Sequence, residues 1–334
     1  MTSETPRFSI IIPTRNRVGM LQQVLDALLQ EEKISRSAYE IIVVDDASTD
    51  LTPHKMASWP RQASTSTVVV TGIRAETRGG PGACRNLGIQ AARGEIIAFT
   101  DDDCLPARDW LHRLDEAWRQ GEAAPFGLKL AGIGGRTLIS GPAPATLAHR
   151  YMRAHHWWET PKLSGQVVEY LLTCNGSFRR AALLETGGFD PGYGPSGGED
   201  ADLGRRLVAA GYILGYAPDV LVCHQVSTRV TDLLATAFRY GRGQGYTWFN
   251  RAQGGVFWGW ALMGGMLRLA ALPVRASRYA ARGVSVRDAV AFAALDVLVT
   301  FWSGLGAMAS TLQLTRSRAS LRGGRRSSER VRGS

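Results

Sequence analysis

The stretch Glu95-Ile96-Ile97-Ala98-Phe99-Thr100-Asp101-Asp102-Asp103 sets both the expected fold and the expected site. Its apolar run ends in three consecutive carboxylates, and a short apolar run bounded by polar residues predicts a buried strand. The acids then follow the C-terminal end of that strand, where open α/β sheets bind ligands. Adjacent carboxylates repel one another, and a hard divalent cation such as Mg²⁺ or Mn²⁺ relieves that repulsion. The alternative is a solvated acidic turn.

Three further apolar runs precede this strand, at residues 8–12, 41–44 and 68–71. Apolar residues recur at helical spacing over residues 20–28, and residues 81–92 predict a helix after a glycine-rich turn. Strands that alternate with helices predict an α/β, Rossmann-like fold, with a mostly parallel sheet flanked by helices. Because the carboxyl ends of parallel strands share one edge, the polar residues after the first, second and fourth strands should converge there.

Several other classes of protein do not fit the pattern. The turn Arg78-Gly79-Gly80-Pro81-Gly82 is neither Gly-x-Gly-x-x-Gly nor a Walker sequence and does not directly follow a strand, which excludes a dinucleotide-dependent dehydrogenase and a P-loop enzyme. The four cysteines show no Cys-x-x-Cys spacing, so their sequence predicts neither a zinc site nor a disulfide framework and fits a reducing cytosol. Residues 1–7 lack the apolar core of a signal peptide, so secretion is not expected.

The C-terminal region differs in composition from the rest. Residues 256–272 are apolar around Arg268, and residues 289–312 form an apolar run around Asp296 that is long enough to span a bilayer. A two-helix hairpin would export the linker 274–287, whose four arginines oppose the positive-inside trend. We therefore expect helices that lie in the cytoplasmic interface and contact lipid phosphates. The alternative is a pair of helices packed on the preceding domain.

The charge is concentrated at the end of the chain. Of the net charge of +10, residues 315–334 carry +6, from seven arginines and one glutamate. Such a tail predicts an arm that meets an anionic surface, either membrane or nucleic acid, and the alternative is a disordered solubilising tail. The expected division is 1–250 catalytic, 251–314 apolar, helical and membrane-associating, and 315–334 a basic disordered tail.

Seven motifs, in a characteristic order and spacing, carry a resemblance to a known family. They are Ile11-Ile12-Pro13-Thr14-Arg15-Asn16-Arg17, Val43-Val44-Asp45-Asp46-Ala47-Ser48-Thr49-Asp50, Ala83-Cys84-Arg85-Asn86-Leu87-Gly88, Phe99-Thr100-Asp101-Asp102-Asp103, Asn175-Gly176-Ser177-Phe178, Gly187-Gly188-Phe189-Asp190 and Gly198-Glu199-Asp200-Ala201-Asp202-Leu203. Together they resemble inverting family 2 glycosyltransferases (GT2), which have the GT-A fold. The likeness covers residues 8 to about 250.

The resemblance implies roles for individual residues. Donor-binding roles fall to Pro13, Thr14, Arg15, Asp46, Arg78, Arg85, Asp101 and Asp102, metal-binding roles to Asp101, Asp103 and His224, and the general base to Asp200 with Glu199 as a supporting acid. Asp102 should point away from its neighbours if the segment stays extended.

Four of these roles have an alternative. Asp46 could cap a turn, Arg85 could pair with the triple Asp instead of a diphosphate, His224 could be structural, and Asp200 could cap a helix.

The resemblance also implies a reaction. A sugar would move from a nucleotide-diphosphate sugar to a hydroxyl of a saccharide or lipid-linked acceptor, with Mn²⁺ or Mg²⁺ as cofactor. The setting would be cell-envelope polysaccharide or glycolipid synthesis at the cytoplasmic face of the cell membrane. One alternative is a polyprenyl-phosphate sugar transferase of the same fold. A nucleic-acid-binding protein that uses the basic tail is the other, but no nucleic acid is expected because the charge is confined to the end.

Overall fold

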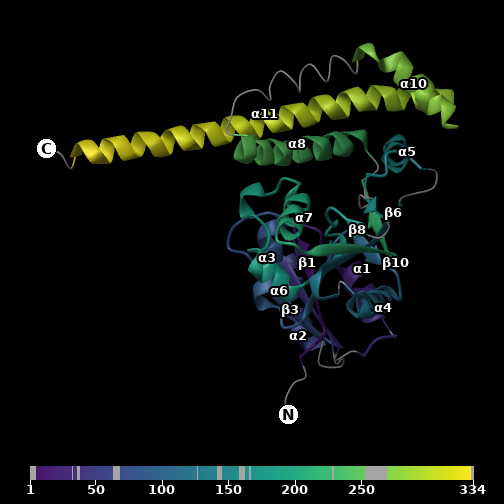
Figure 1. The fold of residues 1–334 in the computed structure, drawn as a ribbon, viewed down its shortest axis with the longest axis vertical. Helices are drawn as coiled ribbons and strands as arrows, with labels where there is room; N and C mark the ends of the chain where they lie inside the picture. Colours follow the sequence, from purple (N-terminus) through teal and green to yellow (C-terminus); the bar gives the residue numbers. More distant parts are fainter. Residues whose placement is uncertain are drawn as a thin grey trace. The chain divides into compact units, whose positions relative to one another are not determined.

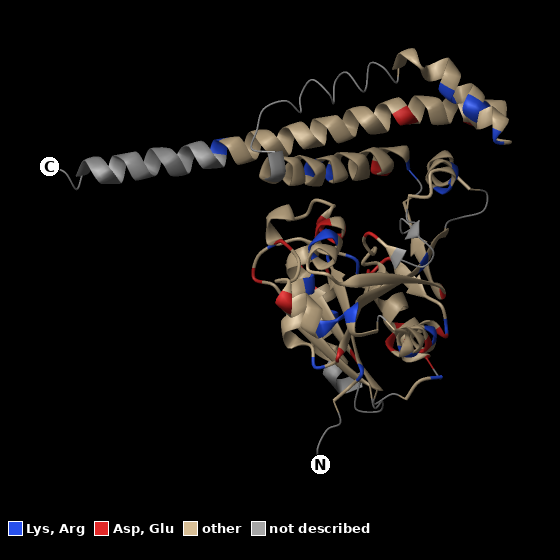
Figure 2. Ribbon diagram, in the orientation of Figure 1, with Lys and Arg blue, Asp and Glu red and all other residues tan. Residues whose placement is uncertain are grey.

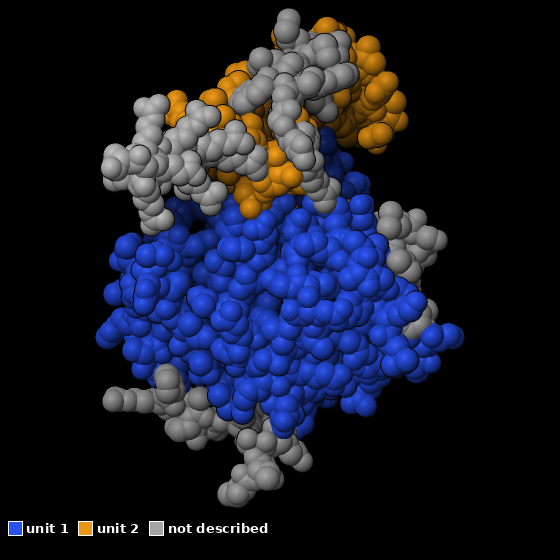
Figure 3. All heavy atoms as spheres, turned by 60° about the vertical axis from the view of Figure 1, so that its left-hand side comes forward, with its two compact units in different colours: residues 1–145, 152–195, 199–226 blue, residues 146–151, 196–198, 227–334 orange. Residues whose placement is uncertain are grey.

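The computed structural model describes residues 5–31, 33–35, 38–62, 68–125, 127–140, 145–157, 162–164, 167–227, 229–252 and 269–331. The chain divides into two compact units (Figure 3), with unit 1 comprising residues 1–145, 152–195 and 199–226. Unit 2 comprises residues 146–151, 196–198 and 227–334. The boundary at residue 226 precedes the expected one at 250, because the helix Val230–Ala252 belongs to unit 2.

Unit 1 is built on a ten-stranded sheet in the order β3-β2-β1-β4-β9-β6-β10-β8-β7, with β5 paired to β10 (Figure 1). Strands β3, β2, β1 and β4 are parallel. Because β9 is antiparallel to both β4 and β6, those two strands point the same way, as does β10. The strands are β1 (Phe8–Thr14), β2 (Tyr39–Asp45), β3 (Val69–Arg74), β4 (Ile96–Thr100), β5 (Cys104–Pro106), β6 (Leu130–Ser140), β7 (Lys162–Ser164), β8 (Val167–Val168), β9 (Asn175–Arg179) and β10 (Ile213–Gln225).

This topology decides which residues reach one edge of the sheet. The C-terminal ends of β1, β2, β4 and β10 lie at the same edge as the N-terminal end of β9. The predicted α/β class is therefore confirmed, and the antiparallel β9 adds a segment, residues 173–175, that the strand-alternation argument did not place at this edge.

Helices cover both faces because the strands are apolar on both faces. Ile10 and Ile12 of β1 join a core with the helices α1 and α4, whereas Ile11 joins a second core with α3 and α7. The helices of unit 1 are α1 (Val18–Leu29), α2 (Thr52–Gln62), α3 (Pro81–Ala91), α4 (Trp110–Ala123), α6 (Arg180–Glu185) and α7 (Glu199–Ala209), with short 3₁₀ turns η3 (Gly127–Lys129) and η4 (Pro191–Tyr193).

Unit 2 is helical. A Cβ added at Gly241 of α8 would lie 1.9 Å from the carbonyl oxygen of Ser303 in α11, so glycine permits a close approach of these two helices. The elements are α8 (Val230–Ala252), α10 (Leu272–Ala281), α11 (Val286–Val331) and the start of α5 (Leu147–Ala154). Residues 256–268 of the first apolar run lie outside the described residues.

The apolar run around Asp296 is confirmed as helical, within α11. Within the described residues, Val286–Arg316 is long and apolar enough to cross a membrane, with 33% of its most apolar window buried. The structure continues α11 to Val331, whereas a disordered tail was expected from residue 315. Propagating an existing helix costs far less than nucleating one, and arginine is a good helix former.

Candidate active site

The ends of β1 and β4 are joined through Asp102. Its Oδ2 accepts a hydrogen bond from Thr14 Oγ1 at 2.8 Å, and its Oδ1 lies 2.9 Å from Arg17 Nη1. Burial and the neighbouring Asp103 charge raise the pKa of Asp102 to about 6, although Arg17 and Thr14 oppose this shift. The chain turns at Asp102 instead of staying extended, so the condition for Asp102 to point away from its neighbours is not met, and Arg17 Nη1 contacts both Asp102 and Asp103.

Asp103 faces His224, which lies near the end of β10. Asp103 Oδ1 is 3.3 Å from His224 Nε2, and Oδ2 is 2.5 Å from Arg17 Nη1. Burial opposes ionisation of Asp103, but the His224 hydrogen bond and the Arg17 charge hold its pKa well below the usual range. Burial likewise disfavours the charged imidazole, but Asp103 raises the pKa of His224 above its ordinary value. The pair behaves as an ionised carboxylate next to a basic imidazole.

Asp101 lies on the other side of the same turn and contacts Arg85. The Arg85 guanidinium is 3% exposed, and its Nη2 donates to Asp101 Oδ1 at 2.7 Å. Its Nη1 lies 3.0 Å from Glu199 Oε1 and 3.7 Å from Asp200 Oδ1. Of the two roles considered for Arg85, the structure supports pairing with the triple Asp and adds the acid pair at the start of α7.

Glu199 and Asp200 lie in the first turn of α7, and the Asp200 carboxylate also bonds outside that helix. Its oxygens accept hydrogen bonds from the backbone nitrogen of Thr173 at 3.1 Å and from Thr173 Oγ1 at 2.9 Å. Burial raises the pKa of Asp200, with Arg85 and Thr173 opposing the shift. Burial and the Asp200 charge also raise the pKa of Glu199, against the effect of Arg85. The Asp200 side chain is 22% exposed, so part of it reaches solvent.

Asp46, at the end of β2, organises the glycine-rich turn before α3. Its carboxylate accepts hydrogen bonds from the backbone nitrogens of Gly79 at 2.7 Å and Gly80 at 3.1 Å. In the loop that follows β2, the residue that caps the turn is Asp45. Its Oδ1 accepts a hydrogen bond from the backbone nitrogen of Ser48 at 3.0 Å. The capping alternative thus falls to Asp45, and a donor contact by Asp46 stays a prediction.

The other expected donor residues differ in how the structure holds them. Pro13 and Thr14 are buried in β1, and Arg15 donates to the carbonyl oxygens of Asp46 and Ala47, which fixes the loop after β2. Arg78 is exposed. Its expected role at a diphosphate stays a prediction.

Sequence reasoning did not assign roles to two residues that contact the predicted acids. Arg17 neutralises Asp102 and Asp103, and Thr173 holds Asp200. Arg17 follows the first strand, so the strand-end argument alone could have found it. Thr173 belongs to the segment 173–177, which resembles the acceptor-side turn of the family, and it reaches the edge because β9 is antiparallel.

One edge of the sheet thus gathers carboxylates, an arginine and a histidine that contact one another. The chain belongs to glycosyl transferase family 2, whose model matches residues 9–183. Glycosyltransferase AglE of Haloferax volcanii is 33% identical over 248 residues, 74% of this chain and 76% of that protein. A pre-mycofactocin glycosyltransferase of Mycobacterium tuberculosis is 29% identical over 322 residues, 91% of this chain but only 63% of that protein, so the chain spans less than two thirds of it. The protein is a transferase enzyme of this family.

Solved structures show the same fold. The mannosyltransferase PcManGT from Pyrobaculum calidifontis, in complex with GDP-Man and Mn²⁺, is 22% identical with a TM-score of 0.60, covering 92% of this chain and 87% of its own. GalNAc-T7 with UDP, GalNAc and Mn²⁺ is 17% identical with a TM-score of 0.54, covering 78% of this chain and 51% of its own. The expected GT-A fold is confirmed.

Proposed function

We propose that this protein is an inverting glycosyltransferase that moves a sugar from a nucleoside-diphosphate sugar to a hydroxyl of a saccharide or lipid-linked acceptor. The observation that carries the proposal is the arrangement of two groups of side chains around the Arg85 guanidinium. Nη2 of Arg85 pairs with Asp101, which lies beside Asp103 and His224, and Nη1 lies 3.7 Å from Asp200. The first group suits a metal-bound diphosphate, and the second suits an attacking hydroxyl.

The residues present fit a divalent cation. Asp101 and Asp103 each offer an oxygen, and these atoms lie within 4.8 Å of each other, while His224 Nε2 is 3.3 Å from Asp103 Oδ1. Carboxylates suit Mg²⁺ and Mn²⁺, and the added imidazole favours Mn²⁺. The solved neighbours that contain Mn²⁺ support this choice. When bound, the ion supplies Lewis-acid stabilisation of the leaving diphosphate.

Asp200 is the proposed general base. A base must lie within hydrogen-bond reach of the attacking hydroxyl, and Asp200 combines a partly exposed carboxylate with a pKa raised by burial. Thr173 fixes its orientation through two hydrogen bonds, so little reorganisation is needed when an acceptor arrives. Arg85 keeps the base apart from the donor acids and limits the repulsion between them.

Unit 2 is the proposed membrane-associating part. The exposed large apolar side chains on the described part of α11 fall within an arc of about 160° at 3.6 residues per turn. They are Val286, Val290, Leu298, Phe301, Trp302 and Leu312. Asp296 lies outside this arc and accepts hydrogen bonds from Tyr151 and Tyr279, both at 2.8 Å. The charge inside the apolar run is therefore satisfied within the unit and does not interrupt the exposed stripe.

Basic residues adjoin the stripe. Figure 2 shows basic residues around α10 and the start of α11. Arg278, Arg282 and Arg287 are exposed there, whereas Arg275 pairs with Asp296. An apolar helix face with arginines at one end is typical of a helix that lies on an anionic membrane surface. We propose the cytoplasmic membrane face as the location, with acceptors from cell-envelope polysaccharide or glycolipid synthesis.

Thermal-shift titration tests the donor and metal assignments. Nucleoside-diphosphate sugars with Mn²⁺ should raise the melting midpoint, because a ligand that binds only the folded state stabilises it by ~2.7 kcal/mol at 100 times its Kd. Asp103→Asn should abolish the Mn²⁺-dependent part of the shift. Asp26→Asn, on the exposed face of α1, is the matched control. A full shift in Asp103→Asn, or in wild-type protein with EDTA, contradicts the metal site.

Vesicle sedimentation tests the membrane assignment. Leu298→Gln with Phe301→Gln removes two half-exposed apolar side chains and should weaken partitioning by ~2–3 kcal/mol, or about 30–150-fold. Leu51→Gln with Leu128→Gln makes the same change at exposed positions of unit 1 and should leave sedimentation unchanged. Equal sedimentation of both double variants would exclude the α11 stripe as the contact.

A further inference from the structure

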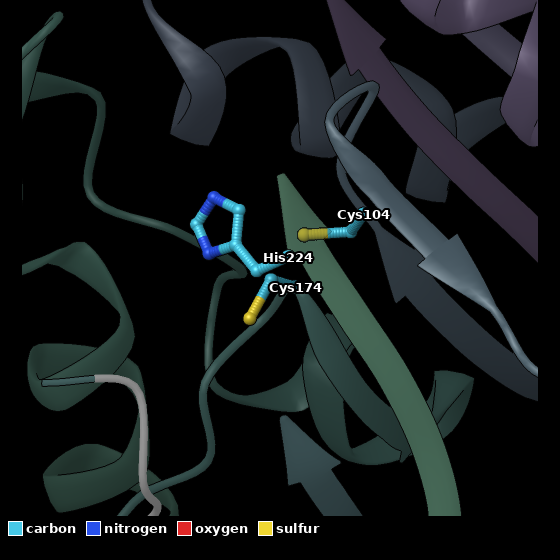
Figure 4. A group of neighbouring side chains, drawn as sticks. All are labelled: Cys104, Cys174 and His224. Carbon is cyan, nitrogen blue, oxygen red and sulfur yellow. The ribbon is translucent and has the colours of Figure 1, made fainter. Parts of the chain in front are cut away.

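Two cysteines that are distant in the sequence lie beside His224. Cys104 and Cys174 are 0% and 4% exposed, and His224 is 6% exposed. One donor atom from each residue lies within 4.8 Å of the others, and Figure 4 shows the two sulfur atoms next to the imidazole ring. The cysteine spacing gave no hint of a metal site, so this cluster is a product of the tertiary structure.

The backbone holds the three residues in place. Cys104 pairs directly with His224 in the β5–β10 ladder. Cys174 precedes β9, whose first residue pairs with Thr100 at the end of β4. Thr100 Oγ1 lies within hydrogen-bonding distance of the carbonyl oxygens of both cysteines, at 3.4 and 3.2 Å.

A fourth donor adjoins the cluster. Asp103 Oδ1 lies 3.6 Å from Cys104 Sγ and 3.3 Å from His224 Nε2. Ligands of a tetrahedral Zn²⁺ at Zn–S ≈ 2.3 Å and Zn–N ≈ 2.0 Å stand roughly 3.3–3.8 Å apart, which matches the two distances to Asp103. The donor atoms of Cys104, Cys174 and His224 lie within 4.8 Å of one another, so they would have to move closer together when the ion binds. Thiolate with imidazole selects Zn²⁺ over Mn²⁺ or Mg²⁺.

We propose that Cys104, Cys174 and His224, with Asp103 as fourth ligand, form a high-affinity Zn²⁺ site at the edge of the sheet. Each cysteine releases its thiol proton to solvent when the sulfur binds the ion. Zinc uptake does not depend on the proposed glycosyl transfer. Its consequence does rest on that function, because Zn²⁺ would take His224 and Asp103 from the donor-binding cation and inhibit the enzyme.

Metal uptake by the chelator-stripped, reduced full chain tests the site without any sugar substrate. Equilibrium dialysis against Zn²⁺ buffered at nanomolar concentration should give one ion per chain. Co²⁺ in its place should produce near-ultraviolet thiolate-to-cobalt charge-transfer absorption. Cys104→Ser and Cys174→Ala should each weaken Zn²⁺ binding at least 100-fold and lose the cobalt band. Cys223→Ser, next to His224 but on the opposite face of β10, should retain both.

Three results would each overturn the site. The wild type could show no thiolate-to-cobalt absorption, or the Cys104 and Cys223 variants could take up zinc equally. The third is a count of two instead of four titratable thiols in the unreduced, unfolded chain. The last would mean that Cys104 and Cys174 form a disulfide. Melting midpoints of each variant check that it is folded, and Cys174→Ala supports the Cys104 result through an independent substitution. If the wild-type protein takes up zinc but shows no Mn²⁺-dependent donor binding, only the proposed donor metal is refuted.

Discussion

Replacing Asp200 by asparagine tests the chemical centre of the proposed reaction. The substitution keeps the shape of the side chain but removes its basicity. Its contacts can largely survive, because Thr173 Oγ1 can either donate or accept a hydrogen bond. The carboxamide oxygen can then face the Thr173 nitrogen while its NH₂ group donates to the hydroxyl. A large effect on turnover therefore cannot be attributed to local unfolding.

The structure sets the expected magnitudes. Two hydrogen bonds become neutral and buried Arg85 loses the Asp200 charge 3.7 Å from its Nη1, which together should cost ~1–3 kcal/mol and lower the melting midpoint by about 2–12 °C. Loss of a general base should reduce turnover by about 10²–10⁴-fold. Affinity for the nucleotide should change less than about threefold, because Asp200 acts on the acceptor. The Asp200 charge also raises the pKa of Glu199, so the variant should hold Glu199 more fully ionised.

The assay combines turnover, nucleotide affinity and melting midpoint on one preparation. Asp202→Asn is the matched control, since it lies in the same turn of α7 and pairs with Arg206 at 2.8 Å on the partly exposed side. The control should cost below ~1 kcal/mol and leave turnover nearly normal. Normal turnover in Asp200→Asn with intact donor binding refutes the base. It would favour transfer to a polyprenyl phosphate, an acceptor that is already ionised and needs no base.

The acidity of Asp200 also predicts the pH dependence of kcat/KM. A base must be ionised to act, and burial raises the pKa of Asp200 above its ordinary value. Activity should therefore rise with pH along a limb that lies above the usual aspartate range, and this limb should disappear in Asp200→Asn. A wild-type profile that is flat down to the usual aspartate pKa of ~3.9 would contradict the assignment.

Three further predictions concern stability. Gly80→Ala should cost at least ~2 kcal/mol more than Gly187→Ala, because both glycines have positive φ but only at Gly80 would the new Cβ lie 2.1 Å from the Gly194 carbonyl oxygen; equal melting midpoints would contradict that close approach. Arg85→Met should lower the free energy of unfolding by ~3–5 kcal/mol at neutral pH and by less in acid. The reason is that Glu199, with its raised pKa, binds a proton more tightly in the folded than in the unfolded chain. Urea unfolding measures this loss, and a loss that grows as the pH falls would contradict the prediction. Asp296→Ala should speed hydrogen exchange in α10 and α11 by about 100-fold or more, because Arg275 and two tyrosine hydroxyls lose their shared carboxylate partner. Asp288→Ala, which breaks a more exposed pair with Arg150, is the control and should change exchange little.

Much of unit 1 follows from local pattern. The apolar runs at residues 8–12, 41–44 and 95–99 became β1, β2 and β4 because burial on both faces of the sheet demands continuous apolar residues. The placement of polar groups at the edge followed from strand direction alone, and the Thr14–Asp102 contact joins two of these strand ends as expected. The family motifs then identified the class of enzyme.

What the sequence determined by itself was therefore the order of strands and helices, the edge that carries the polar residues and the family. Only the tertiary structure decided the partners at that edge. The Arg85 pairing with Glu199, the Thr173 support of Asp200 and the meeting of Cys104, Cys174 and His224 each join segments distant in sequence. Local propensity and periodicity act over a few residues, whereas these contacts depend on long-range packing. The Arg85–Glu199 pair needs α3 beside α7, and the positions of Thr173 and Cys174 need the antiparallel insertion of β9 between β4 and β6.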